Sequence, residues 1–125
     1  MSGQSGARRE LGRRGEDLAA KRLQAEGYRI LARNYRCVAG EVDLVAEDGD
    51  WLVFVEVRTR HGDRWGTPEE SVTKAKQARL IQVAENYVAE QEAWDMAWRI
   101  DVVAVDLDSR GHVRRLEVLR NVVSR

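Results

Sequence analysis

The chain of 125 residues has few of the residues that cross-link or constrain a fold, with one cysteine, one proline and two histidines. A single cysteine, Cys37, cannot form an internal disulfide, so nothing ties the fold to an oxidising compartment. The sequence also lacks an apolar run long enough for a membrane span and a hydrophobic leader segment. We therefore expect a soluble, cytoplasmic protein.

The chain also has no net charge at pH 7, because 21 Lys and Arg residues balance 21 Asp and Glu residues. Global charge therefore gives no support for nucleic-acid binding. The distribution is uneven, since residues 1–36 hold nine basic and four acidic side chains. A basic segment of this kind can contact phosphates, but it can equally form the solvated surface of a helix.

Several common catalytic motifs are absent from the sequence. It contains no Gly-rich phosphate-binding loop and no serine nucleophile elbow. His61 and His112 fall in separate expected loops and, with one cysteine, make no zinc-binding pattern. The acidic residues are therefore the first candidates for a functional site.

The composition is that of an ordinary globular domain, with 43% hydrophobic and 34% charged residues. A chain of this length is expected to form one domain and to bury roughly two-thirds of its unfolded surface. We expect residues 1–10 to form a flexible N-terminal tail and residues 11–125 to form a single domain.

The periodicity of apolar residues predicts the order of the secondary-structure elements. Helices are predicted over 11–26 and 71–90, and strands over 28–35, 40–47, 51–58, 98–107 and 113–119. The segment 51–57 is apolar on both faces and should be a central strand. The strand–helix–strand passage from 51 to 107 requires a parallel pairing. The sum is an α/β domain of αβββαβ order with a mixed sheet.

The second and third predicted strands bring acidic residues together. Asp48-Gly49 between them is a strong signal for a two-residue hairpin loop. If these two residues form the loop, Asp43 faces Phe54 and Glu41 faces Glu56. Facing and diagonal residues share one face of the sheet, so the three acids should converge there.

Converging carboxylates beside an apolar strand are unfavourable unless a positive charge compensates them. One source of compensation is a hard divalent cation such as Mg²⁺, which prefers oxygen ligands. The other is pairing with Arg58 and Arg60 at a half-solvated hairpin. The spacing of the residues leaves both explanations open.

Both predicted helices, and the strand at 98–107, place charged residues near the core. Glu16 borders the apolar face of the first helix, whereas Asp17 points to water. Lys76 falls in the middle of the apolar face of the second helix, either as a site residue or as a lysine whose stem packs on the sheet. Arg99 and Asp101 are expected to form a structural pair at the start of their strand.

The segments GEVDLV (40–45) and FVEVRTR (54–60) resemble the D…ExK signature of the restriction-endonuclease-like, or PD-(D/E)xK, nucleases. The wider pattern resembles the YraN-like family of bacterial proteins and is also similar to archaeal Holliday-junction resolvases. That pattern comprises GEDLAAKRL (15–23), GYRILARNYR (27–36), SVTKAKQARL (71–80) and RIDVVAV (99–105) beside the two segments above. The resemblance implies a restriction-endonuclease-like αβββαβ core, with a mixed central sheet flanked by helices.

The resemblance also implies roles for individual residues. Asp43 and Glu56 correspond to the ligands of a divalent metal, Mg²⁺ or Mn²⁺, and Glu16 to a glutamate that completes the acidic cluster. Arg58 stands where a nuclease usually has lysine. Arginine can stabilise phosphate charge, but its pKa above ~12 prevents it from acting as a base. Lys76, on the following helix, is the candidate to replace that lysine.

The activity implied is that of a metal-dependent endonuclease acting on DNA, including branched or recombination intermediates. We assign substrate binding to Arg60, Arg64, Trp65 and Lys74; Trp65 could stack on an unpaired base or anchor its own loop. Junction nucleases generally need two active sites, so a homodimer is expected, and no membrane partner. The alternative is a catalytically degenerate module that binds nucleic acid or a protein without cleavage.

Overall fold

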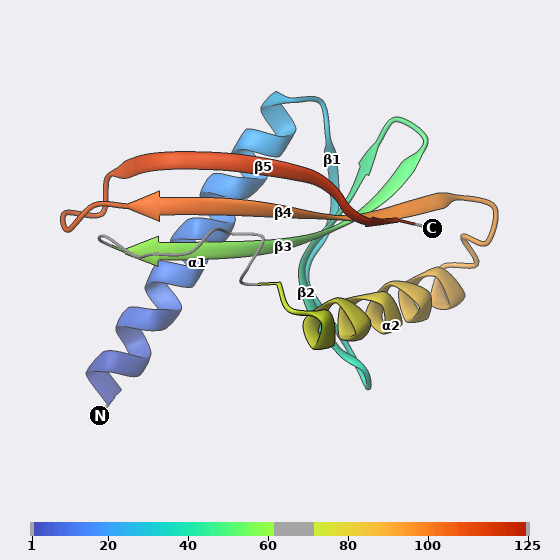
Figure 1. Cartoon of the computed structure of the whole chain (residues 1–125), viewed down its shortest axis with the longest axis horizontal. Helices are drawn as coiled ribbons and strands as arrows, with labels where there is room; N and C mark the ends of the chain where they lie inside the picture. Colours follow the sequence, from blue (N-terminus) through green and yellow to red (C-terminus); the bar gives the residue numbers. More distant parts are fainter. Residues whose placement is uncertain (1, 62–71, 125) are drawn as a thin grey trace.

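The computed structural model describes residues 2–61 and 72–124, and the side chains of residues 10–61 and 72–123. Its elements are α1 (Ser2–Ala25), β1 (Arg29–Cys37), β2 (Gly40–Asp48), β3 (Trp51–His61), α2 (Lys74–Glu90), β4 (Ala97–Leu107) and β5 (Val113–Ser124) (Figure 1). Within these described ranges, no helix is both long and apolar enough to cross a membrane.

The five strands form one mixed sheet in the order β1-β2-β3-β4-β5. β3 and β4 run parallel, and the other neighbouring pairs are antiparallel. The parallel pair is joined through α2, as the strand–helix–strand pattern requires. The expected αβββαβ order, the mixed sheet and the central place of the strand at 51–58 are therefore confirmed.

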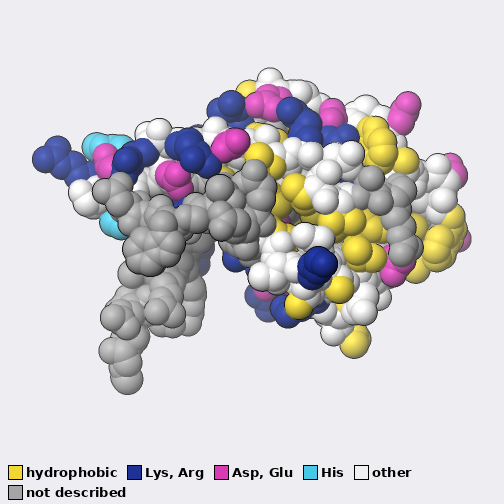
Figure 2. Space-filling model, viewed as in Figure 1, with side chains coloured by type: hydrophobic (Ala, Val, Ile, Leu, Met, Phe, Trp, Pro, Cys, Tyr) yellow, Lys and Arg dark blue, Asp and Glu magenta, His cyan; other side chains and the backbone are white. Residues whose placement is uncertain are grey.

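The two helices cover opposite faces of the sheet. Successive side chains of a strand point to opposite sides, and on β3 Phe54 packs with Val83 of α2, whereas Val55 packs with Leu23 of α1. Figure 2 shows apolar side chains on the face between α2 and β5, with basic side chains beside the beginning of α2. The chain is thus a helix–sheet–helix arrangement with β3 buried at its centre.

Several element boundaries differ from the prediction. α1 begins at Ser2 and not at residue 11, α2 begins at Lys74 and not at residue 71, and β5 continues to Ser124. The expected flexibility of residues 1–10 stays a prediction. The predicted start of α1 relied on an apolar face, which residues 2–10 do not have, so the sequence pattern gave no signal for the earlier start. The sequence predicts a polar loop over 59–70, but β3 continues to His61. Residues 62–71 lie outside the described residues.

The hairpin between β2 and β3 has a different loop from the predicted one. Asp48 pairs with Trp51, so Gly49 and Asp50 form the loop and the register is shifted. Gly49 has a positive φ of 60°, which suits glycine at the first loop position of a type II′ turn. Because the loop still has two residues, each side chain keeps its face, but Asp43 does not lie opposite Phe54.

Candidate active site

Asp43 and Glu56 meet where β2 separates from β3. The paired residues of β2 and β3 run from the Asp48–Trp51 pair to the Leu44–Val55 pair. Beyond that pair, the Val57 N–H donates to Asp43 Oδ2 at 2.7 Å, so a side-chain carboxylate receives a β3 amide hydrogen bond. Continued register would set Asp43 opposite Glu56, and the two carboxyl groups share the gap between the strands.

Glu56 is buried, with 6% of its surface exposed, and its carboxylate faces two cations. Lys76 Nζ lies 2.6 Å from Glu56 Oε2, and Arg58 Nη1 lies 3.5 Å from the same oxygen. Lys76 belongs to the first turn of α2, where the Thr73 side chain accepts a hydrogen bond from the Lys76 N–H. This N-cap fixes the start of the helix and places the lysine against the buried acid.

Glu16 approaches the same region from α1 because the helix lies very close to β3. A Cβ atom added to Gly15 would lie 1.9 Å from the Thr59 hydroxyl, so only glycine permits this approach. Glu16 is half-buried and Asp17 is exposed, as the helical periodicity predicted. Arg33 contacts both acids, at 3.7 Å from Glu16 and 2.7 Å from Asp17.

The electrostatics of the cluster act most strongly on Asp43. Burial, followed by the negative charge of Glu56, raises the pKa of Asp43 to about 7, and the charge of Glu16 adds to this effect. The hydrogen bond from Val57 opposes the increase. A carboxyl group that prefers to stay protonated near neutral pH lacks positive charge within its own protein surroundings.

All five residues predicted to be catalytic line one hollow of about 740 Å³, namely Glu16, Asp43, Glu56, Arg58 and Lys76. They come from α1, β2, β3 and α2, which converge at the point where β2 and β3 part. Two arginines that the sequence reasoning missed, Arg36 and Arg79, also line the hollow. Arg79 could have been found from its position one helical turn after Lys76.

The predicted substrate-binding residues lie less centrally. Arg60 is half-buried on β3, and Lys74 is exposed at the beginning of α2. Neither residue belongs to the lining of the hollow. Arg64 and Trp65 lie outside the described residues, so their predicted roles stay predictions.

The donor set of the hollow suits a cation that prefers oxygen ligands, such as Mg²⁺ or Mn²⁺, better than a zinc ion held by His and Cys. No group of three or more His, Cys, Asp or Glu side chains within the described ranges is arranged to hold a metal ion. Two adjacent carboxylates, Asp43 and Glu56, are however the protein ligands that Mg²⁺ typically takes, with waters and substrate phosphate completing its shell. The raised pKa of Asp43 agrees with a site that needs an added positive charge.

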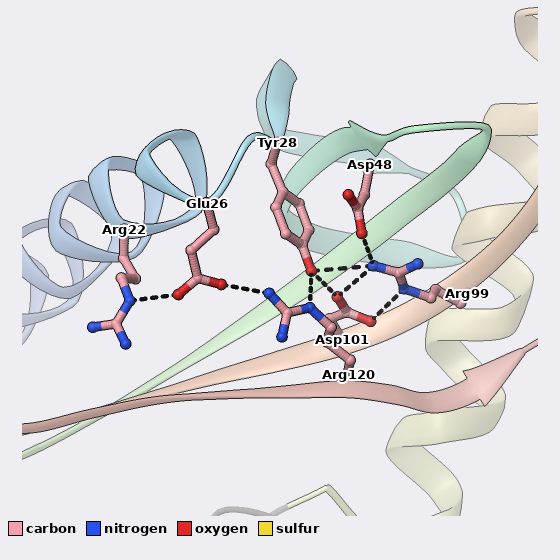
Figure 3. A network of polar contacts seen from close by, with 7 residues as sticks. All are labelled: Arg22, Glu26, Tyr28, Asp48, Arg99, Asp101 and Arg120. Atoms are coloured by element: carbon pink, nitrogen blue, oxygen red, sulfur yellow. Dashed lines mark hydrogen bonds and ion pairs between the residues drawn. The ribbon is translucent and has the colours of Figure 1, made fainter.

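A second polar cluster lies on the sheet, at Asp101 of β4 (Figure 3). Asp101 is fully buried and accepts hydrogen bonds from Arg99, from the Tyr28 hydroxyl at 2.8 Å and from the Asn121 N–H at 2.8 Å. Arg99 also contacts Asp48 at 2.7 Å. The expected pairing of Arg99 with Asp101 is confirmed, at 3.0 Å.

The fold and the hollow define the class of this protein: a mixed α/β domain with an αβββαβ core and a carboxylate cluster between two parting strands. The chain belongs to the family described as Uncharacterised protein family UPF0102, which it matches over residues 15–105. The five residues that line the hollow and were predicted to be catalytic all fall in this range. The YraN-like resemblance drawn from the sequence is therefore confirmed.

Individual relatives resemble the chain over most of its length. A UPF0102 protein of Pelotomaculum thermopropionicum is 49% identical over 92% of this chain and 96% of the relative. A UPF0102 protein of Symbiobacterium thermophilum is 51% identical over 85% and 90%, respectively. One from Beutenbergia cavernae is 48% identical over 93% and 98%. Their names carry no activity, so function has to be argued from the site.

Proposed function

We propose that the chain is a divalent-metal-dependent endonuclease that hydrolyses phosphodiester bonds in DNA, with branched DNA among its substrates. The observation that carries the proposal is the pairing of Asp43 and Glu56 in a hollow, with the pKa of Asp43 raised to about 7. Two acids held together at this energetic cost are explained by a cation that they bind. Mg²⁺ or Mn²⁺ fits their oxygen donors.

The residues of the hollow have different roles in such a reaction. Asp43 and Glu56 would hold the metal. A bound Mg²⁺ supplies a more acidic water and polarises the phosphoryl oxygens. Positively charged side chains in the hollow then stabilise the charge that develops on the phosphate, which is the largest contribution in most enzymes of this kind.

Lys76 and Arg58 are the two cations that contact Glu56 and can fill this role. Arg58 has a fixed charge and forked donors, which suit a phosphate but cannot remove a proton from water. Lys76 is closer to the carboxylate, at 2.6 Å. We therefore assign to Lys76 the place of the signature lysine and to Arg58 the stabilisation of phosphate charge.

The experiment that tests the proposal measures metal binding and cleavage separately. Mn²⁺ binding is followed by its electron paramagnetic resonance signal, and cleavage with linear, flapped and four-way DNA in Mg²⁺ or Mn²⁺. Asp43→Asn and Glu56→Gln are expected to abolish both signals. Lys76→Ala should abolish cleavage while leaving Mn²⁺ bound, and Arg58→Lys should raise the rate.

The matched control is Asp50→Asn, an exposed acid in the β2–β3 loop that should change neither signal. Cleavage that persists unchanged in Asp43→Asn and Glu56→Gln would come from a contaminant and would remove the enzymatic proposal. Mn²⁺ binding that is the same in all variants would show that the metal does not use these two carboxylates.

A second candidate function is a nuclease-fold module that binds nucleic acid or a protein partner without cleavage. One observation favours it: Lys76 already neutralises Glu56 at 2.6 Å, as a permanent substitute for a metal would. Binding of DNA that is insensitive to chelator, with no cleavage in any metal, would select this function. Mn²⁺ binding lost on Asp43→Asn would select the first.

A further inference from the structure

Arg79 differs from the other cations that line the hollow. Lys76 and Arg58 contact Glu56, and Arg36 contacts Glu41 at 3.3 Å. Arg79 lines the same hollow with an exposed side chain. Among the residues that the structure describes, it has neither a hydrogen bond nor an ion pair. A cation therefore stands beside an acidic cluster without being used to neutralise it.

The stem of Arg79 is held in place by the turn between β1 and β2. A Cβ atom added to Gly40 would lie 3.0 Å from Arg79 Cδ and 3.3 Å from Cγ. Gly40 also has a φ of 143°, which other residues rarely adopt. The absence of a side chain at Gly40 thus leaves the space in which the Arg79 stem lies across the turn.

The spacing on α2 relates Arg79 to the centre of the site. Residues three apart on a helix are neighbours, with Cβ atoms roughly 5–6 Å apart. Lys76 contacts the buried Glu56. Arg79 lies one helical turn further along the same face of α2, at the edge of the hollow. The helix therefore presents one cation inside the hollow and a second at its edge.

We propose that Arg79 binds a backbone phosphate next to the one that is cleaved, so that the substrate is an extended phosphodiester chain and not a mononucleotide. Guanidinium groups form paired hydrogen bonds with phosphate oxygens. An exposed arginine whose stem already packs against a turn loses less conformational freedom when it binds such a group. The substrate class rests on the proposed function, whereas phosphate binding by Arg79 can be tested without cleavage.

The test measures binding of a fluorescent single-stranded oligonucleotide in chelator, at several salt concentrations, by anisotropy. The full chain carries Asp43→Asn, which removes the charge that would repel phosphates and prevents cleavage. In this background Arg79→Ala is expected to weaken binding about 5- to 20-fold. The slope of log affinity against log salt should also fall by about 0.7, the value for one phosphate contact on a single strand.

Two further variants separate a specific contact from general charge and from misfolding. Arg79→Lys keeps the charge and should restore the salt slope. Arg29→Ala removes one exposed positive charge at the other end of β1, and it should leave both affinity and slope unchanged. Urea midpoints of all variants show that each one is folded.

The possible results separate this inference from the proposed function. An Arg79→Ala variant with the affinity and slope of its parent overturns the role of Arg79, even if the wild-type chain cleaves DNA. Equal losses in Arg79→Ala and Arg29→Ala also overturn it, as does a parent chain that does not bind. A selective loss in Arg79→Ala supports it, even if no cleavage is found.

Discussion

Asp43 and Asp101 are two acids of the same sheet with opposite surroundings. Asp101 is fully buried, and its partners are donors: Arg99, the Tyr28 hydroxyl and the Asn121 N–H. Asp43 receives one amide hydrogen bond and otherwise faces the carboxylates of Glu56 and Glu16. The first acid is compensated by donors of its own protein, whereas the second lies next to like charges.

The difference is between a polar cluster whose charges are compensated within the protein and the candidate functional site. A buried charge that is paired and hydrogen-bonded fixes the packing of the elements around it, and its loss is costly. Burial raises the pKa of Tyr28, and its hydrogen bond to Asp101 adds to the increase. The raised pKa of Asp43 instead comes from burial and from repulsion by Glu56 and Glu16, which the hydrogen bond from Val57 only partly offsets. Perturbed groups of the second kind mark functional sites more often than structural ones.

The largest expected effect is from Asp101→Asn. Both carboxylate oxygens accept hydrogen bonds, so an amide would turn its NH₂ group toward donors and leave Arg99 without a buried counter-charge. We expect the free energy of unfolding to fall by about 3–5 kcal/mol. Urea unfolding at pH 7, followed by circular dichroism, measures it. A loss below about 1 kcal/mol would contradict the structural role of this cluster.

In the absence of metal, Asp43→Asn should raise the free energy of unfolding, whereas Asp101→Asn lowers it. The folded state raises the pKa of Asp43 from its ordinary value of 3.8 to about 7. Between these pH values the folded wild-type chain binds more protons than the unfolded chain, so its stability falls as pH rises. Asp43→Asn avoids this loss and should be more stable above pH 7 by on the order of 2–4 kcal/mol. The two chains should have similar stability below about pH 4.

Unfolding experiments from pH 4 to pH 8 in chelator check this prediction. Saturating Mn²⁺ should stabilise the wild-type chain by mass action but not the variant, so the order of stability should reverse. If Asp43→Asn is destabilised at pH 8 in chelator, Asp43 is compensated within the protein after all, and the contrast with Asp101 is lost.

Gly15→Ala tests whether the acidic cluster depends on the close approach of α1. The new methyl group would meet the Thr59 hydroxyl at 1.9 Å, so the helix must shift and carry Glu16 with it. We expect a loss of about 1–3 kcal/mol in stability and weaker Mn²⁺ binding. Gly12→Ala is the matched control, because nothing lies within 4 Å of its added Cβ. Because alanine has a higher helical propensity than glycine, Gly12→Ala should be neutral or slightly stabilising.

The sequence predicted the composition of the site better than its geometry. Alternation along the strands and periodicity along the helices give the face of each side chain, and the structure brings Asp43, Glu56, Glu16 and Lys76 to one hollow. The register could not be predicted, because Gly49 can occupy either position of a two-residue loop. That choice decides whether Asp43 lies opposite Phe54 or continues in register toward Glu56.

The partners of Asp101 that are distant in sequence could not be predicted. The pairing of Arg99 with Asp101 follows from their positions two residues apart on one strand. Tyr28 is 73 positions away from Asp101, and Arg120 is 92 positions away from Tyr28. Only the assembled sheet brings them together. The same holds for Arg79, whose contact with the β1–β2 turn depends on how α2 packs.

The smallest expected effect is at the outer end of the Asp101 cluster, where Arg22 contacts Glu26 at 2.6 Å (Figure 3). Both side chains are partly exposed, with Arg22 in the last turn of α1 and Glu26 directly after the helix. The arginine precedes the glutamate, which is the weaker orientation of such a pair. Arg22→Ala should therefore lower the free energy of unfolding by less than about 0.5 kcal/mol. The loss should shrink further at high salt, because exposed pairs are screened.

Arg120→Ala is the comparison for this last prediction. Arg120 contacts Glu26 as well, and its Nε also donates to the Tyr28 hydroxyl at 2.9 Å. Its removal takes a donor from a partly buried hydroxyl, so we expect a loss of about 1 kcal/mol. Urea unfolding at two salt concentrations measures both variants. Equal losses in the two variants would mean that contacts nearer the buried centre of the cluster do not contribute more to the free energy of unfolding. That result would contradict the view that the donors around Asp101 stabilise it.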